Sequence, residues 1–235
     1  MIIDEDAGHE LRELLEVPRA ARELAWQERF EAALRVAPMV KLEDRILQGP
    51  DEFPYLVLSQ RSDEPLERLV SVGGVAEECT ERGLGVVIDP SPSGPAWVLH
   101  YGQLWSLREY GGFGGDPADE RPEPGATVAA PEEREVLVGQ PSARMLPDYA
   151  RRVLDSYLRQ AVGLAEPRVL VLVDPTQRPS RNLVFNVHPE KFRDPRAIEA
   201  VLGSLSWFMP PGRGVLALSA RAGYDDAFAP LWPPS

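Results

Sequence analysis

The side chains best suited to chemistry in this chain are three histidines, one aspartate and one serine. His9, His100 and His188 lie far apart in the sequence, whereas Asp89 and Ser93 closely precede His100. Asp89, Ser93 and His100 are the residue types of a hydrolytic Ser-His-Asp triad. Prolines interrupt the segment that holds Asp89 and Ser93, which favours an ordinary loop over an organised site. A hydrolase that uses these residues is therefore the alternative hypothesis, and a non-enzymatic protein is the preferred one.

No short catalytic or cofactor motif accompanies these residues. The chain lacks the nucleophile elbow G-x-S-x-G, the phosphate loop G-x-x-x-x-G-K-[ST], the zinc motif H-E-x-x-H and the redox motif C-x-x-C. A glycine run at 111–115 could approach a phosphate, but it leads into Asp116 and further acids, whose charge would repel that ligand. We therefore predict no catalytic residue, no cofactor and no metal.

Aromatic side chains gather in one stretch, which contains Trp97, Tyr101, Trp105 and Tyr110. If residues 97–105 are extended, Trp97, Tyr101 and Trp105 share one face, because alternate residues of a strand point the same way. Such a face is core where it is buried and a binding hot spot where it is exposed, since Trp and Tyr dominate interface energetics. The three residues are candidates for binding a partner.

Acidic residues also form clusters, and the formal net charge is -12 at pH 7. The clusters are Asp4, Glu5 and Asp6; Asp116, Asp119, Glu120 and Glu123; Glu132, Glu133 and Glu135; and Asp225 and Asp226. They are either solvated surface or a face that steers a basic partner protein. The charge opposes binding to nucleic acid or anionic membranes. We name as candidate partner-binding residues Asp116, Asp119, Glu120, Asp225 and Asp226.

The composition favours a cytoplasmic protein. Cys79 is the single cysteine, which excludes an internal disulfide and a cysteine-rich zinc site. The first residues are acidic where a signal peptide needs basic ones. No segment approaches the roughly 20 apolar residues of a membrane span.

The C-terminal half is organised around two neighbouring strands within residues 168–188. The run 169–173 is apolar throughout, which predicts that both of its faces are covered. A strand at 135–138 and a helix from 147 precede it, and a helix capped by Asp194 and a strand at 215–218 follow. The order predicts a split β-α-β-β-α-β domain with a four-stranded sheet and both helices on one face. Either the N-terminal half or a second copy of the chain, in a homodimer, should cover the other face.

The N-terminal half predicts helices at 9–16 and 19–36, interrupted at Pro18. Strands are expected at 39–42, 55–58 and 85–88, with a helix at 75–82 that stops at Gly83. Glycine, proline and acids dominate residues 111–130, which is typical of a linker. The predicted organisation is therefore an α+β protein with domains at 1–110 and 131–235.

Several of these stretches resemble the SseB family, named for enhanced serine sensitivity. They are LRELLEVPRAARELAWQERFEAALRV at 11–36, FPYLVLSQ at 53–60, and in the C-terminal half RVLVLV, NLVFNV, MPPGRGVLAL and AFAPLW. The resemblance covers most of the chain and rests on hydrophobic pattern and a few anchor residues. It implies two α+β domains, an adaptor or regulatory role, relatives at secretion and toxin immunity loci, and no catalytic residues.

The sequence as a whole predicts a non-enzymatic, cytoplasmic protein-binding module of adaptor, chaperone or immunity type. Its acidic balance and aromatic residues favour a basic partner protein. The alternative is a hydrolase-like enzyme with a site in the cleft between the halves, using Asp89, His100 or His188.

Overall fold

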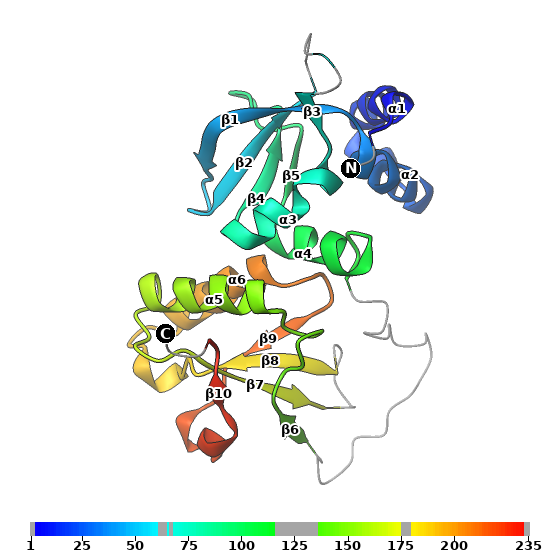
Figure 1. The fold of residues 1–235 in the computed structure, drawn as a ribbon. Helices are drawn as coiled ribbons and strands as arrows, with labels where there is room; N and C mark the ends of the chain where they lie inside the picture. Colours follow the sequence, from blue (N-terminus) through cyan, green and yellow to red (C-terminus); the bar gives the residue numbers. More distant parts are fainter. Residues whose placement is uncertain (1–2, 61–64, 66–67, 116–135, 175–179, 233–235) are drawn as a thin grey trace. The chain divides into compact units, whose positions relative to one another are not determined.

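The chain folds into two α+β units, as its sequence predicts. The computed structural model describes residues 3–60, 65, 68–115, 136–174 and 180–232. One unit comprises Met1–Phe113 and the other Gly114–Ser235, and each has its own mixed sheet and helices (Figure 1). Phe113 packs in the core of the first unit, whereas residues 116–130 of the predicted linker lie outside the described part of the chain.

The first unit begins with a helical hairpin. Its elements are α1 (Glu5–Glu16), the 3₁₀ turn η1 (Arg19–Ala21) and α2 (Leu24–Val36). Asp4 caps α1, because its carboxylate accepts the backbone N–H groups of Asp6 at 3.0 Å and Ala7 at 3.4 Å. Pro18 separates the two helices as predicted, but the second helix begins only at Leu24.

A five-stranded mixed sheet follows the hairpin. In the order of the sheet its strands are β3 (Leu69–Val70), β1 (Met39–Gln48), β2 (Pro54–Ser59), β4 (Gly85–Ile88) and β5 (Trp97–Leu99). β2 and β4 are parallel, and the other neighbouring pairs are antiparallel. β1 extends beyond its predicted end at residue 42, because it pairs with β2 on both sides of a register shift between Lys41 and Ile46.

Two further helices complete the first unit, α3 (Val72–Arg82) and α4 (Tyr101–Tyr110). α3 ends as predicted at Gly83, whose φ of 71° suits glycine. α4 corrects the expectation that residues 97–105 form one extended segment. The change from strand to helix occurs at His100, whose backbone N–H donates to the Gln103 side chain at 3.0 Å.

One apolar cluster forms a core that draws on every helix of the first unit. The hairpin contributes Leu11 and Leu14 from α1, and Phe30, Ala33 and Leu34 from α2. The facing strand residues alternate along the sheet, as expected for one of its two faces, and are Leu56, Leu58, Val86, Ile88 and Leu99. Burial of these apolar side chains fixes the hairpin to the sheet.

The second unit has the predicted order β-α-β-β-α-β and then a C-terminal segment. In the order of the chain these elements are β6 (Leu137–Gly139), α5 (Asp148–Gln160), β7 (Arg168–Val173), β8 (Arg181–Phe185), α6 (Pro195–Phe208) and β9 (Gly214–Leu216). A short turn η3 (Pro189–Lys191) lies between β8 and α6. Asp194 caps α6 as predicted, since its carboxylate accepts the Arg196 N–H at 2.9 Å.

The strand pairing differs in detail from the predicted four-stranded split arrangement. β7 pairs antiparallel with β8, and β8 pairs parallel with β9. On its other edge β7 pairs antiparallel with β6 and with a fifth strand, β10 (Ala229–Pro230). No strand is inserted between those that α5 and α6 connect, so neither connection is split.

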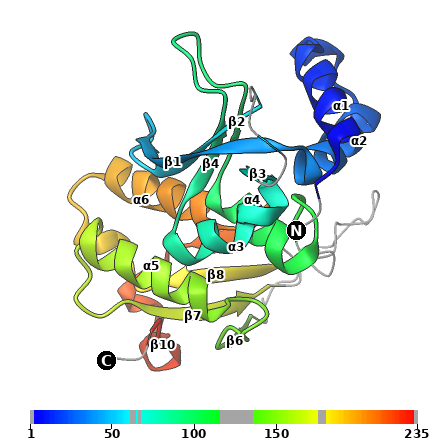
Figure 2. The same cartoon turned by 45° about the horizontal axis from the view of Figure 1, so that its top comes forward.

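The apolar strand β7 is covered on both faces, as predicted, but by a different element. α5 and α6 lie on one side of the sheet, and the C-terminal segment lies on the other, in both views (Figures 1 and 2). On that second side Phe228 packs with Leu170, Leu172 and Val184. The cover is therefore part of the same unit, which corrects the expectation of the N-terminal half or a second copy.

Within the described residues, every helix is too short or too polar to cross a membrane.

Candidate functional site

The predicted hydrolytic residues do not assemble into a triad. Asp89 follows the last residue of β4, whereas the pairing of Val86 with Leu99 places His100 opposite Gly85, the first residue of that strand. Four residues of strand separate the two positions by about 13 Å, at about 3.3 Å per residue. A general base must come within hydrogen-bond reach of the group it serves. Asp89 and His100 therefore cannot act together.

Asp89 has a structural role at the end of the parallel strands. Its carboxylate accepts the Ser59 hydroxyl at 2.7 Å, the Gln60 backbone N–H at 3.1 Å and the Gln60 side-chain amide at 3.0 Å. Its φ of 44° is uncommon for a residue with a side chain. These bonds hold the ends of β2 and β4 together. Ser93 lies on the exposed loop that follows and contacts Ser91 at 2.9 Å.

The three histidines occupy separate local settings. His9 is exposed on α1, where Nδ1 lies 3.0 Å from the Arg12 guanidinium. Burial lowers the pKa of the His100 imidazole, although the carboxylate of Asp51 opposes that shift. His188 is buried in the second unit, with Nδ1 at 3.1 Å from the Leu218 carbonyl oxygen.

The remaining reactive groups also lack the setting of an active site. Burial raises the pKa of the Cys79 thiol to about 12, so the nucleophilic thiolate is scarce at neutral pH. The glycine run begins at Gly111, which ends α4 with a φ of 76°. It therefore follows a helix, unlike a phosphate loop, which follows a strand and opens a helix. Among the described residues, no three His, Cys, Asp or Glu side chains are grouped to hold a metal.

The aromatic candidates do not form the single face that the sequence predicted. Trp97 lies at the start of β5 and is half-buried beside Trp26 and Phe30. Tyr101 and Trp105 lie on α4, and both are 0% exposed. The Tyr101 hydroxyl donates to the Thr80 carbonyl oxygen at 3.0 Å. The alternation of side chains that would place these residues on one face applies only to a strand, and it ends where α4 begins. The three residues therefore do not form one surface.

The acidic candidates lie in two places. Asp116, Asp119 and Glu120 fall outside the described residues. Asp225 and Asp226 are exposed on the 3₁₀ turn η5 (Asp225–Ala227) of the second unit. The second unit, Gly114–Ser235, contains 16 acidic and 14 basic residues, so these two aspartates belong to a unit whose charges nearly balance.

The negative charge is concentrated in the first unit. Residues 1–113 contain 21 acidic and 11 basic residues, which is most of the charge excess of the whole chain. Within the hairpin, residues 4–36 contain the acids Asp4, Glu5, Asp6, Glu10, Glu13, Glu16, Glu23, Glu28 and Glu31, against the arginines Arg12, Arg19, Arg22, Arg29 and Arg35. Most of these acids are exposed. We refer to these nine acidic residues as the hairpin acids.

Arg22 is directed at two tryptophan rings and at backbone carbonyl oxygens of the hairpin. Its guanidinium carbon lies 4.5 Å from the ring centroid of Trp26 and 5.6 Å from that of Trp97. It donates to the carbonyl oxygens of Val17 at 3.0 Å and Leu15 at 3.2 Å. These two carbonyl oxygens lie at the C-terminal end of α1, where the helix has no further backbone N–H groups to donate to them. Arg22 therefore fixes the bend of the hairpin.

Trp26 ties the two helices together in the same way. Its indole N–H donates to the Leu14 carbonyl oxygen of α1 at 2.9 Å. Its ring stacks on Phe30 with centroids 4.6 Å apart and planes 13° apart. Near the middle of the hairpin Arg29 and Glu10 form an ion pair at 2.8 Å. These contacts join the two helices of the hairpin, and the acids Glu13, Glu16, Glu23 and Glu28 are exposed on it.

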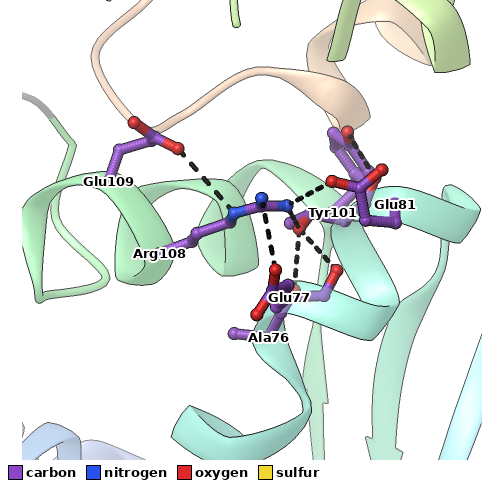
Figure 3. Close-up of polar contacts among 7 residues, drawn as sticks. Ala76, Glu77, Glu81, Tyr101, Arg108 and Glu109 are labelled. Atoms are coloured by element: carbon purple, nitrogen blue, oxygen red, sulfur yellow. Dashed lines mark hydrogen bonds and ion pairs between the residues drawn. The ribbon is translucent and has the colours of Figure 1, made fainter. Parts of the chain in front are cut away.

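A second acid-rich group lies between α3 and α4 (Figure 3). The Arg108 guanidinium lies 3.8 Å from Glu77, 3.1 Å from Glu81 and 3.9 Å from Glu109, and donates to the Thr80 hydroxyl at 2.8 Å. Three carboxylates thus lie around one guanidinium. The contacts of Arg108 with Thr80 and Glu81 join α4 to α3.

One carboxylate of the first unit carries a pH-dependent part of the stability. A hydrogen bond from Lys41 at 2.6 Å, and another from Arg82 at 2.7 Å, hold the pKa of Glu78 below 4.5. The ionised form is therefore favoured in the folded state. Its contribution is complete above the unfolded pKa and disappears as the pH falls through the folded pKa.

Glu78→Gln is expected to lower the free energy of unfolding at pH 7 by about 0.5–1 kcal/mol, because the side chain is partly exposed and screened by solvent. The difference from the unsubstituted protein should shrink as the pH falls through the folded pKa of Glu78, because both proteins then carry a neutral side chain. Urea unfolding at pH 7 and at a series of lower pH values measures it, with the exposed Glu13→Gln as a control that has little effect at any of them. A difference that persists at low pH would assign the effect to packing.

Sequence reasoning missed the hairpin acids as a group. It named only Asp4, Glu5 and Asp6 among them as a cluster. The available signal was the difference in charge between the two halves, which composition alone reveals.

Comparison with known proteins finds no match: no family model, no curated protein and no solved structure resembles this chain significantly. The resemblance to the SseB family therefore stays a prediction.

Proposed function

We propose that the protein is a non-enzymatic protein-binding module whose acidic first unit engages a basic partner protein. An adaptor, chaperone or immunity-type role fits such binding. The observation that carries the proposal is the concentration of acidic residues on a firmly supported helical hairpin. The separation of Asp89 from His100 supports a non-enzymatic role.

The hairpin suits electrostatic recognition for two reasons. Its carboxylates project from helices whose bend is held by Arg22 and Trp26, so binding needs to order the acidic side chains but not the backbone that carries them. Its arginines are partly engaged, since Arg22 faces inward and Arg29 pairs with Glu10. An acidic surface of this kind raises the association rate with a basic partner and makes it depend on salt.

The predicted partner-binding acids that lie outside the hairpin are not equally important for the proposed binding. Asp116, Asp119 and Glu120 directly follow the first unit in the sequence and extend its negative charge. Asp225 and Asp226 lie in a unit whose acidic and basic residues nearly balance, so we assign them a minor part. Cytoplasmic residence is the matching location, because the single cysteine, Cys79, is free and buried.

Neutralising four hairpin acids tests the proposal. The variant Glu13→Gln, Glu16→Gln, Glu23→Gln and Glu28→Gln removes charges from exposed positions and leaves the core untouched. The unsubstituted protein should capture a partner from its own cell lysate at about 50 mM salt. We expect the variant to capture about tenfold less of that partner, or less still. Quantitative mass spectrometry of the retained proteins measures the loss.

Two comparisons locate the binding. The variant Asp225→Asn and Asp226→Asn should keep the partner, and raising the salt to about 500 mM should release it from every version of the protein. Retention that survives both the four substitutions and high salt would exclude an acidic docking surface on the hairpin. Loss only in the second variant would move the surface to the second unit.

A further inference from the structure

The C-terminal segment of the second unit, Leu218–Leu231, lies across the sheet on the side opposite α5 and α6 (Figure 1). We call it the C-terminal strap. It contains two 3₁₀ turns, η4 (Ala220–Ala222) and η5, and the two-residue strand β10. Phe228 is 5% exposed and packs on Leu170, Leu172 and Val184. Leu218, Tyr224 and Ala227 pack more loosely around this contact.

The C-terminal strap is attached at its two ends. At its start, the Leu218 carbonyl oxygen lies 3.1 Å from His188 Nδ1. The Glu190 carboxylate accepts the Ser219 hydroxyl and, at 3.4 Å, the Ala220 N–H. At its end, Ala229 pairs with Val169 of β7, and the Leu231 N–H donates to the Pro167 carbonyl oxygen at 2.9 Å. Residues 220–226 between these attachments are mostly exposed.

The sheet beneath the strap has its own support. β7 is paired with β8 on one edge and, at Val171–Val173, with β6 on the other, and α5 and α6 cover the opposite face. The strap has little regular structure and only a few backbone bonds to the sheet. Elements of this kind open locally at a lower free energy than the whole unit unfolds. Opening would expose the apolar side chains of Leu170, Leu172 and Val184 together with the edge of β7 at Val169.

We propose that the C-terminal strap is displaceable, and that the surface it uncovers binds an extended peptide segment with an aromatic side chain from a partner protein. The strap itself shows what fits. It places an aromatic ring on the apolar face and an antiparallel strand along the edge of β7, which is the geometry of peptide recognition by strand addition. This surface is separate from the acidic hairpin, so the proposal extends beyond the function proposed above.

Thiol labelling of the full chain tests the displacement. Val184 and Leu183 are neighbours on β8, and both are 0% exposed, but only Val184 belongs to the cluster beneath the strap. Val184→Cys should react with a thiol reagent at least about tenfold faster than Leu183→Cys, because its exposure needs only local opening. Adding Glu190→Ala to each should raise the first rate and leave the second unchanged. Equal rates for the two cysteines, with or without Glu190→Ala, would overturn the proposal.

A synthetic peptide with the sequence of residues 224–232 tests the occupant. At millimolar concentration it should slow labelling of Val184→Cys severalfold by filling the uncovered surface. The same peptide with alanine in place of Phe228 is the matched control and should have little effect. Fast labelling that the first peptide does not slow would leave the strap displaceable but would overturn the proposed occupant.

Discussion

Replacing Phe30 by alanine is expected to lower the free energy of unfolding of the first unit by about 3–5 kcal/mol. Phe30 is 2% exposed and lies at the point where the hairpin meets the sheet. Its ring stacks on Trp26, and its centroid lies 4.4 Å from that of Trp97. The substitution removes both aromatic contacts and leaves a cavity that these large rigid rings cannot fill by small movements.

Urea unfolding followed by tryptophan fluorescence measures this loss, because Trp26 and Trp97 both lie against the deleted ring. Leu24→Ala is the matched control: it lies on the same helix but is 70% exposed, so it should cost less than about 0.5 kcal/mol. A cost below about 1 kcal/mol for Phe30→Ala would show that the aromatic group is loosely packed.

The same substitution connects the packing of the hairpin to its proposed function. The bend between α1 and α2 depends on Arg22, which lies over Trp26 and Trp97. Loss of Phe30 removes the support behind the Trp26 ring. The hairpin acids would then be held less firmly, and part of the binding energy would be used to order them again.

Elements with strong local signals could be predicted from the sequence. α3 ends at Gly83, because the chain needs a positive φ there that glycine adopts freely. α6 begins with Pro195 directly after its cap Asp194, which is the typical start of a helix. The run of apolar residues in β7 predicted a strand covered on both faces. In each case the physical cause lies within a few residues.

The prediction of an extended segment after Trp97 was wrong because the residues from Trp97 to Tyr110 fit both the period of a strand and that of a helix. Trp97, Leu99, Tyr101 and Trp105 are spaced for one face of a strand, while Leu104 and Leu107 are spaced for the buried stripe of a helix. The Gln103 side chain favours the helix, because it accepts the backbone N–H of His100 at the start of α4. That signal is short and common, so the spacing alone could not resolve the choice.

The C-terminal strap and the exposure of the hairpin acids could not be predicted for a different reason. β10 has two residues, and its pairing with β7 depends on a partner about sixty positions earlier in the chain. The net charge was evident from composition, but its location on the hairpin depends on which side of each helix is buried. Contacts between distant segments decide both features, and local sequence carries little information about them.

Replacing Gly85 by alanine is expected to destabilise the first unit by about 3 kcal/mol, through overpacking. A Cβ atom at this position would lie 2.6 Å from two ring carbons of Tyr55 and 2.7 Å from the Leu99 carbonyl oxygen. The carbonyl belongs to the backbone of a paired strand and cannot turn away. The ring cannot move easily either, because the Tyr55 hydroxyl donates to Asp51 at 2.5 Å.

Gly49 closes the other side of the same ring, since a Cβ atom there would lie 2.7 Å from Tyr55. Two glycines on flanking segments thus make room for one aromatic side chain that lies along the sheet. Relief of the Gly85→Ala strain therefore requires removal of the ring. We expect the added methyl group to cost clearly less in a Tyr55→Ala background, with the Leu99 carbonyl accounting for the remainder.

Thermal and urea unfolding of the four proteins of this double-mutant cycle measure the coupling between Gly85 and Tyr55. Gly203→Ala provides the contrast, because Gly203 lies inside α6 with no other atom close to a new Cβ. That substitution should stabilise the second unit by about 0.5–1 kcal/mol, as alanine favours a helix over glycine. If Gly85→Ala were as harmless as Gly203→Ala, β4 would have room to shift away from Tyr55 and Leu99, and the close packing of this edge of the sheet would be disproved.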